Sequence, residues 1–238
     1  MSLGSPGRGA LRRIYQEVAP RYELVNHLLT LGLDIRWRRR AARVAVASEG
    51  GSWLDVCSGT GEMAAELHRA ANRAITVAAF DLSVPMLVRA RGKRRLRPDA
   101  FASGDVAHLP FRNGTFTGVT IAFAARNLNT SRRHLEIRLR ECFRVLIPGG
   151  RLINLETSQP ESRLWRRLFH HYAALTVRPL ARTVSGSRSG YAYLAHTIPR
   201  FYSAAELDEM LFAAGAARVT HIRLWGGIAA LHIAEKAR

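Results

Sequence analysis

Short apolar runs alternate with helical segments along most of this chain, and this alternation limits the fold more than any other feature. The apolar runs predict strands at Ser52–Cys57, Ala74–Phe80, Ala100–Ser103, Phe116–Phe123 and Arg151–Leu155. The segments between them predict helices at Glu62–Ala71, Val84–Arg94 and Arg132–Val145, and a turn at Pro148-Gly149-Gly150. Because strands separated by helices of this length form parallel βαβ units, we predict an α/β fold.

Three segments lie outside the alternation. Residues 11–47 carry apolar residues at helical spacing, with a break around Pro20, and predict N-terminal helices. Residues 160–200 predict a helix followed by a loop, and Arg218–Leu224 with Ile228–Ala234 predict a closing hairpin. The expected organisation is therefore a flexible N-terminus (1–10), a helical cap (11–47) and one α/β domain (48–238) with a helical lid insertion (160–200).

The most specific local feature is a glycine-rich loop between the first strand and its helix, Asp55-Val56-Cys57-Ser58-Gly59-Thr60-Gly61-Glu62. Glycines at this place let the backbone approach a nucleotide closely. The loop is not a P-loop, because it lacks the Gly-Lys-Ser/Thr ending, and Cys57 replaces the first glycine of G-x-G-x-x-G. Asp55 would repel a pyrophosphate but suits a cationic ligand such as S-adenosylmethionine, which has an ammonium, a sulfonium and no phosphate.

Two further acids follow the next two strands. Asp81 could accept hydrogen bonds from ribose hydroxyls, or it could cap the helix at Val84 unless Ser83 does so. Asp105 could accept from an adenine amino group, or it could be a solvated loop acid. Ligands of open α/β sheets bind at the carboxyl ends of strands. Three acids that follow three successive strands therefore predict one nucleotide-type site at that edge.

Taken together, these residues resemble the class I S-adenosylmethionine methyltransferases, and within them the ubiquinone/menaquinone C-methyltransferase family. The motifs that carry the resemblance are Tyr22-Glu23-Leu24-Val25-Asn26, Trp37, Phe123-Ala124-Ala125-Arg126-Asn127, Arg144–Gly150 with Glu156-Thr157-Ser158, Tyr191–Leu194 and Gly226–His232. The glycine loop is shared by the whole superfamily, whereas the Arg-Asn pair and the Leu-His ending are specific to the family. Departures include Asp34 in place of His and Ala122 in place of a Ser that touches the cofactor, and they bear on the exact quinone.

The resemblance implies a Rossmann-like seven-stranded class I methyltransferase sheet with helices on both faces, N-terminal helices and a helical lid insertion. It implies S-adenosylmethionine as cofactor and a polyprenylated quinol as substrate, either demethylmenaquinol or a 2-polyprenyl-6-methoxy-benzoquinol type. The expected cofactor contacts are Asp55, Ser58, Gly59, Thr60, Gly61, Asp81, Leu82, Met86, Asp105, Val106 and Ala122.

Four residues are expected to act on the substrate: Arg126, Asn127, Glu156 and Tyr22. A guanidinium cannot readily act as a base, so we expect Arg126 to stabilise a phenolate or position a water, with Asn127 orienting the ring; the alternative is a surface salt bridge. Glu156 is expected to accept the proton or to partner Arg126, and a structural ion pair is its alternative. Tyr22, with Tyr191 and Tyr193, is expected to cap the pocket or to pack in the core.

Other candidate groups have simpler interpretations. His232 could serve as a base near neutral pH, but its place in a closing strand favours a core histidine. Cys57 is expected to be a small packing residue. No His, Cys or Asp cluster shows metal-ligand spacing, so no metal is expected.

The chain carries a net charge of +18, with 36 Lys and Arg against 18 Asp and Glu. An apolar content of 47% excludes a disordered basic tail. A nucleic-acid partner or RNA methyltransferase is the alternative that this charge raises, but no basic-aromatic platform supports it. The helix expected in 160–200 has a stripe of Leu164, Leu168, Tyr172 and Leu175, with arginines beside it. Such a helix can rest on an anionic membrane or pack as a lid.

The expected location is cytoplasmic, with a peripheral position on the inner face of the membrane, because two cysteines and the lack of an apolar leader favour a reduced compartment. A homodimer is compatible with the sequence. Two further alternatives are a methyltransferase of another lipid or small aromatic substrate, and a catalytically silent cofactor binder.

Overall fold

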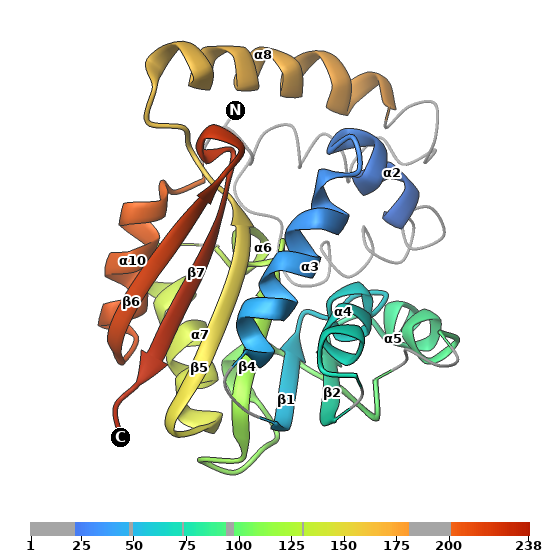
Figure 1. Cartoon of the computed structure of the whole chain (residues 1–238), viewed down its shortest axis with the longest axis vertical. Coiled ribbons are helices and arrows are strands. Elements are labelled where there is room, and N and C mark those ends of the chain that lie inside the picture. The colour runs from blue at the N-terminus through green and yellow to red at the C-terminus, as the bar shows by residue number, and fades with distance from the viewer. Residues whose placement is uncertain (1–21, 48–49, 73, 94–97, 130, 181–200) are drawn as a thin grey trace.

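The computed structural model describes residues 22–47, 50–72, 74–93, 98–129, 131–180 and 201–238. Within them, seven strands form one sheet in the order β3-β2-β1-β4-β5-β7-β6 (Figure 1). The strands are β1 (Gly51–Val56), β2 (Ile75–Asp81), β3 (Ala100–Ser103), β4 (Phe116–Ala122), β5 (Leu146–Thr157), β6 (Ala216–Leu224) and β7 (Ala229–Lys236). Strands β1 to β5 pair in parallel, whereas β7 lies antiparallel between β5 and β6. The predicted seven-stranded sheet and its closing hairpin are confirmed.

Helices cover both faces of this sheet. They are α2 (Tyr22–Leu29), α3 (Leu33–Val46), α4 (Glu62–Ala70), α5 (Val84–Arg91), α6 (Ala125–Leu128), α7 (Arg132–Val145), α8 (Arg163–Leu180) and α10 (Ala204–Ala213). On one face, α3 and α4 bury Trp37 and Leu67 against Leu155 of β5. On the other face, α7 and α10 bury residues such as Leu139 and Met210. The two buried clusters explain why the central strands are apolar on both sides.

Side-chain caps fix the starts of the two helices on the second face. Ser131 accepts a hydrogen bond from the backbone N–H of His134 at the start of α7. At the start of α10, Ser203 accepts from the N–H of Glu206, and the Glu206 carboxylate accepts from the N–H of Ser203 at 2.8 Å. This capping box satisfies backbone donors that the first turn of a helix leaves free.

The start of β5 differs from its sequence prediction. We predicted a turn at Pro148-Gly149-Gly150 and a strand from Arg151, but β5 begins at Leu146 and includes all three residues. Leu146 pairs with Phe116, and a register shift before Gly118 absorbs the irregularity. Gly149 has a φ of +75° and donates its N–H to Ala237. The turn-forming residues therefore bend the strand without ending it.

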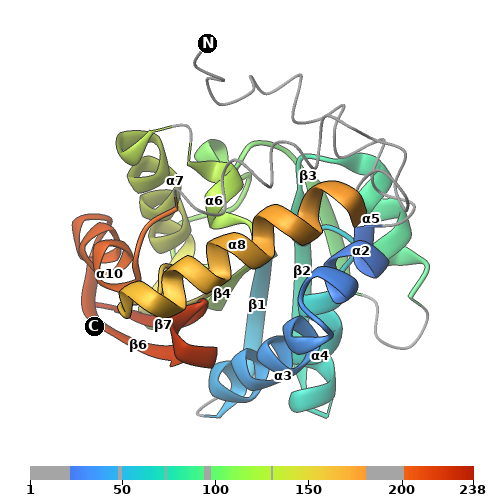
Figure 2. The same cartoon turned by 90° about the horizontal axis from the view of Figure 1, so that it is seen from above.

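Helices α2 and α8 lie at the edge of the sheet where the parallel strands end. Helix α8 crosses above that edge, and α2 packs against it (Figure 2). The turn between α2 and α3 contains Leu31 and Gly32, both at positive φ, whereas the predicted break at Pro20 and the loop near Ser185 lie outside the described residues. Among the described helices, none is both long and apolar enough to cross a lipid bilayer.

Candidate functional site

The glycine loop leaves β1 at the carboxyl edge and turns sharply into α4. Cys57, Gly59 and Gly61 all have positive φ values, so a non-glycine residue holds the first of these strained positions. A Cβ on Gly61 would lie 3.0 Å from the Cβ of Ala90, so this glycine lets the loop pack closely against α5. A Cβ on Gly59 would meet no described atom within 4 Å. Gly59 therefore borders open space, as a ligand-facing backbone requires.

Asp55 is buried beneath this loop, and only one of its two carboxylate oxygens accepts a side-chain hydrogen bond from the described residues. Its Oδ1 accepts a hydrogen bond from the Thr120 hydroxyl at 2.7 Å. Its Oδ2 is buried and makes no hydrogen bond of good geometry among the described residues, although the backbone N–H of Ala64 lies near enough to the carboxyl to lower its pKa. Burial raises the pKa of Asp55 to about 7. A cationic group beside Oδ2 would remove that cost, so the residues fit the ammonium of S-adenosylmethionine.

Asp81 ties the glycine loop to the end of β2. Its two oxygens accept hydrogen bonds from the backbone N–H groups of Gly59 at 2.8 Å and Ser83 at 2.7 Å. The expectation that the Ser83 side chain caps α5 is wrong, because Ser83 makes no side-chain cap bond. Burial raises the pKa of Asp81. Each carboxylate oxygen retains a lone pair, so the predicted contact to ribose hydroxyls stays a prediction.

The remaining expected cofactor residues surround the same strand ends. Asp105 accepts from the N–H of Ala107 at 3.0 Å and lies 3.7 Å from Arg138. It therefore turns the chain after β3 and is not simply a solvated acid. Two of the others, Met86 and Val106, are buried in the core, as are Ser58 and Thr60. Leu82 is exposed beside Asp81, and Ala122 at the end of β4 is half-buried.

A mostly apolar cavity of about 330 Å³ lies above the ends of β4 and β5. Its walls come from α2, α3, α8, the residue after β4 and the turn before β7, and they include Trp37, Phe123, Phe169, Tyr172 and Trp225. Phe123 and Trp225 both have positive φ, as does Leu31 on the same wall. Non-glycine residues adopt this conformation rarely and at a cost. The strained backbone therefore concentrates around the cavity and the glycine loop.

Arg126 lines this cavity and is held rigidly from behind. Its side chain donates to Thr157 at 2.9 Å and lies 3.6 Å from the Glu156 carboxylate. It is only 6% exposed. Its Nε atom is buried without a partner in the described part of the chain. The guanidinium thus keeps a hydrogen-bond donor for a ligand, and the alternative of a surface salt bridge does not fit this burial.

Glu156 lies behind Arg126 and not among the cavity residues. It is fully buried and accepts hydrogen bonds from the backbone N–H groups of Arg126 at 3.1 Å and Thr157 at 2.8 Å. Of its expected roles, the geometry favours partner of Arg126 over proton acceptor. Asn127 is half-buried, and its Oδ1 has no partner among the described atoms. The side chains of Tyr22, Tyr191 and Tyr193 lie outside the described residues.

His232 and Cys57 have structural surroundings. His232 is buried in β7, where its Nε2 lies 3.1 Å from the Ala204 carbonyl and 3.7 Å from Asp208. Burial lowers its pKa, and it does not line the cavity. These contacts favour the core interpretation. Burial raises the pKa of the Cys57 thiol well above its usual value, which does not suit a nucleophile.

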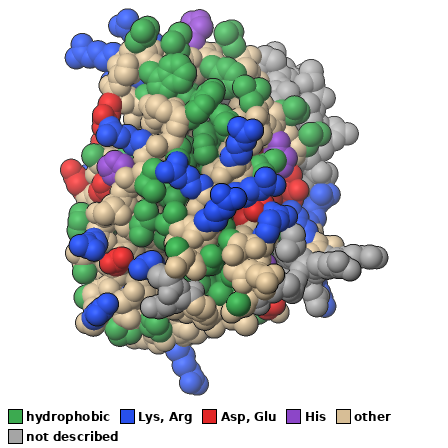
Figure 3. Space-filling view, viewed as in Figure 1, with side chains coloured by type: hydrophobic (Ala, Val, Ile, Leu, Met, Phe, Trp, Pro, Cys, Tyr) green, Lys and Arg blue, Asp and Glu red, His purple; other side chains and the backbone are tan. Residues whose placement is uncertain are grey.

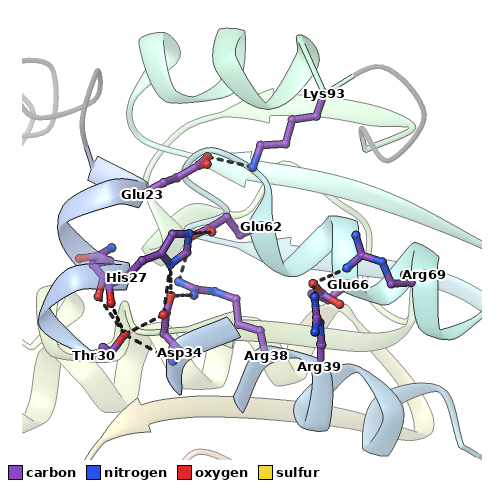
Figure 4. Close-up of polar contacts among 11 residues, drawn as sticks. Glu23, His27, Thr30, Asp34, Arg38, Arg39, Glu62, Glu66, Arg69 and Lys93 are labelled. Carbon is purple, nitrogen blue, oxygen red and sulfur yellow. Dashed lines mark hydrogen bonds and ion pairs between the residues drawn. The ribbon is translucent and has the colours of Figure 1, made fainter. Parts of the chain in front are cut away.

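Sequence reasoning missed a polar cluster between α2, α3 and α4, formed by His27, Asp34, Arg38 and Glu62 (Figure 4). Arg38 pairs with Asp34 at 2.5 Å and with Glu62 at 3.2 Å. His27 lies between the same two carboxylates, 2.9 Å from Asp34 and 3.3 Å from Glu62. The only signal in the sequence is the Asp34–Arg38 spacing of four residues along one helix. Asp34 and Arg38 line the cavity.

Comparisons with known proteins agree with this geometry. A model of the ubiE/COQ5 methyltransferase family matches residues 7–236. The demethylmenaquinone methyltransferase of Thermus thermophilus is 37% identical over 225 residues, which cover 94% of this chain and 100% of that protein. The ubiquinone/menaquinone biosynthesis C-methyltransferase UbiE of Geobacter sulfurreducens is 35% identical over 230 residues, covering 95% of this chain and 88% of that protein. A solved S-adenosylmethionine-dependent methyltransferase from Thermotoga maritima shares the fold, with a TM-score of 0.60 at 18% identity over 94% of this chain and 99% of that chain.

Proposed function

Because the chain belongs to the ubiE/COQ5 methyltransferase family, we propose that it methylates a ring carbon of a polyprenylated quinol in respiratory quinone biosynthesis. It is an S-adenosylmethionine-dependent methyltransferase. The observation that carries the substrate proposal is the buried guanidinium of Arg126, with a spare N–H, in the wall of an apolar cavity. A cavity of this size and polarity suits the ring of a lipid-soluble quinol.

The cofactor, when bound, supplies an electrophilic methyl group on a positively charged sulfur. We assign the residues of the glycine loop to holding it: Asp55 to the ammonium, Asp81 to the ribose and Asp105 to the adenine. Gly59 gives the backbone access that this contact needs. The expected contacts from Ser58, Thr60, Gly61, Leu82, Met86, Val106 and Ala122 complete this proposed site.

Arg126 is the residue that we assign to the developing phenolate. A ring carbon becomes nucleophilic when a phenolic oxygen loses its proton, and a fixed guanidinium stabilises the resulting negative charge. The apolar walls of the cavity exclude water, which strengthens that interaction. Glu156 and Thr157 fix Arg126, and we assign Asn127 to orienting the ring. The capping role of Tyr22 remains part of the same proposal.

The test is methyl transfer from isotopically labelled S-adenosylmethionine to a panel of reduced substrates. Demethylmenaquinol and a 2-polyprenyl-6-methoxy-benzoquinol are the two leading members, and a short-chain catechol and an unrelated lipid are the controls. Transfer to either quinol supports the proposal and identifies the ring. Transfer only to the catechol or the lipid would contradict it and favour another substrate class.

We also propose that the cavity opens onto an anionic membrane surface. Large apolar side chains are exposed in the turn between α2 and α3 and on α8, with Leu31 at 71%, Leu164 at 69% and Leu175 at 66% exposure, and Leu31 also lines the cavity. In Figure 3, hydrophobic side chains gather on the upper part of this face and basic side chains lie below them. Arg36 and Arg39 on α3 are both exposed. Apolar side chains beside arginines suit the boundary of an anionic bilayer.

Flotation with vesicles tests the membrane contact. The protein is expected to float with anionic vesicles at low salt and to be released by salt, and Leu164→Glu with Leu175→Glu is expected to weaken flotation. Arg218→Gln, which lies on the distant strand β6, serves as the charge control. Equal flotation with neutral vesicles, or none at all, would contradict the proposal. Sedimentation measurements on the same samples test the proposed homodimer, and fractionation of cells into membrane and soluble parts tests the proposed localisation.

A further inference from the structure

The proposed reaction needs a group that accepts the phenolic proton, and the cavity restricts the choice. Among the described residues that line it, the ionisable ones are Asp34, Arg38, Arg126 and Tyr172. Guanidinium groups are not bases in proteins. The hydroxyl of Tyr172 donates to the carbonyl of Leu29, and a phenol is no stronger a base than the substrate. Asp34 is the remaining candidate.

We infer that Asp34 is the proton acceptor of the reaction, and that His27 positions it and controls its basicity. The inference rests on the proposed function and deepens it. Glu156, the acceptor expected from the sequence, is fully buried behind Arg126 and does not line the cavity.

The neighbours of Asp34 hold its carboxylate in place and keep it ionised, so that it can accept a proton. Its Oδ1 accepts from the Thr30 hydroxyl at 2.7 Å, its Oδ2 accepts from Arg38 at 2.5 Å, and the His27 Nδ1 lies 2.9 to 3.1 Å from both. A carboxylate offers about four acceptor positions, and these contacts engage both oxygens, with the His27 ring nitrogen shared between them. Burial alone would raise the pKa of Asp34, but Arg38, Thr30 and His27 together lower it. Asp34 is therefore ionised at neutral pH, the state in which it can accept.

His27 connects this buried carboxylate to the surface. Asp34 is 1% exposed, whereas the His27 side chain is 28% exposed and contacts Glu62 with its other ring nitrogen. Figure 4 shows the imidazole between the two carboxylates. The other charged groups facing it are Arg38 on α3 and the Glu23–Lys93 pair, whose atoms lie 2.8 Å apart. A second positive charge on His27 would stabilise the Asp34 carboxylate and make it a weaker base.

The step balances as follows in electrons and protons. The phenolic O–H bond breaks, and its proton forms a new O–H bond to Asp34. The electron pair left on oxygen moves into the ring, and the ring carbon forms a bond to the methyl group while the pair of the old methyl–sulfur bond stays on sulfur. The ring carbon would then lose its hydrogen to water as a proton, and its bonding pair would restore the aromatic ring and leave a phenolate oxygen. That oxygen takes back the proton held by Asp34, so the net release is one proton per methyl group transferred. Arg126 stabilises the negative oxygen during the first part of this sequence.

Asp34→Asn is the test variant, assayed with the quinol that the wild type methylates. We expect kcat to fall about 10²- to 10⁴-fold, the usual contribution of a general base. The loss should shrink for halogenated quinols, whose more acidic phenols need less help from a base. Arg126→Ala should lose activity across the whole series instead. This dependence on substrate acidity separates a proton acceptor from a residue that only holds the fold.

His27→Gln tests the second part of the inference. The variant lacks the ring nitrogen that contacts both Asp34 oxygens, so its kcat should fall, with the largest loss for the least acidic quinol. Glu66→Gln is the matched control, because Glu66 lies on the same helix as Glu62 and pairs with Arg39 and Arg69 away from the cavity (Figure 4). Its kcat for each quinol should match that of the wild type.

Folding and cofactor binding are measured separately by thermal unfolding and by titration calorimetry with S-adenosylmethionine, neither of which depends on turnover. If the wild type methylates no quinol, the proposed function fails. If the wild type is active and Asp34→Asn binds cofactor but loses the same factor with every quinol, or loses nothing, the inference is overturned and the function stands. An unchanged kcat in His27→Gln, or an equal loss with every quinol, would overturn the assignment of His27.

Discussion

Replacing Asp55 by Asn should make the unliganded protein more stable and its cofactor binding weaker. Asp55 has an ordinary pKa of 3.8 that burial raises to about 7 in the folded chain. At pH values between these two pKa values, Asp55 is protonated in the folded state and ionised in the unfolded state. Stability therefore falls as the pH rises through this window. The difference between the two pKa values corresponds to a loss of stability of at most about 4 kcal/mol, at 1.36 kcal/mol per pKa unit.

Asparagine cannot ionise, so Asp55→Asn should lack this slope. Its free energy of unfolding should exceed that of the wild type at pH 7.5 by several kcal/mol at most, and the two should converge near pH 4. Urea unfolding of the unliganded proteins at several pH values measures both. Thr120→Val is the matched control: it keeps the carboxyl but removes the 2.7 Å hydrogen bond to its Oδ1, so it should raise the pKa of Asp55 further.

The affinity of the wild type for S-adenosylmethionine should rise with pH, whereas its stability should fall. With a pKa of about 7, Asp55 is roughly eight times more ionised at pH 7.5 than at pH 6. If the carboxylate receives the cofactor ammonium, wild-type affinity for S-adenosylmethionine should rise by about that factor over the same range. Titration calorimetry should find a weaker, nearly pH-independent affinity in Asp55→Asn. Equal affinities and equal slopes for the two proteins would refute the assignment of Asp55 to the ammonium.

Three further changes give separate expectations. Arg126→Ala should lower kcat about 10²- to 10³-fold, the cost of removing one preorganised donor, while its affinity for the cofactor in calorimetry stays unchanged. An equal loss of cofactor affinity would contradict the assignment of Arg126 to the substrate. Gly61→Ala should lower the free energy of unfolding in urea by about 1–3 kcal/mol, because its φ is +77° and its new Cβ would lie 3.0 Å from the Cβ of Ala90. The control Gly59→Ala, whose Cβ meets open space at a φ of +54°, should lower it less. Equal losses of stability in the two variants would show that packing is not the cause. Ser203→Ala should cost about 1 kcal/mol by removing the capping box of α10, and an unchanged unfolding midpoint would mean that the cap contributes nothing.

The alternation of apolar and helical segments was sufficient to predict an α/β fold, whereas the seven-stranded sheet came from the resemblance to the methyltransferases. Strand β3 and helix α7 have the predicted boundaries, and most other elements differ by a few residues at their ends. The main error was Pro148-Gly149-Gly150, where local turn chemistry was overridden by the pairing of Leu146 with Phe116. Backbone pairing across the sheet is decided by residues far apart in the chain, and no local window contains both partners.

The cofactor loop was predictable, because Asp55 and Asp81 lie at the ends of β1 and β2, Asp105 follows β3, and parallel strands bring their ends to one edge. The contacts of the proposed substrate site were less predictable from the sequence. Arg126 could be named from its motif, but its support by Glu156 and Thr157 depends on β4 and β5 being neighbours. The His27–Asp34–Glu62 contacts join three helices, and sequence spacing carries no information about such contacts.

The position of β7 has a consequence for synthesis of the protein. The strand is the last of those described along the chain, yet it lies inside the sheet, between β5 and β6. Until β7 has emerged from the ribosome, β6 has no partner in the described sheet and β5 presents an open edge. An unpaired apolar edge can recruit strands from other nascent chains. The parallel half can form early, but protection from aggregation waits for the final strand, so shortening the chain within β7 would leave newly made protein with that edge open.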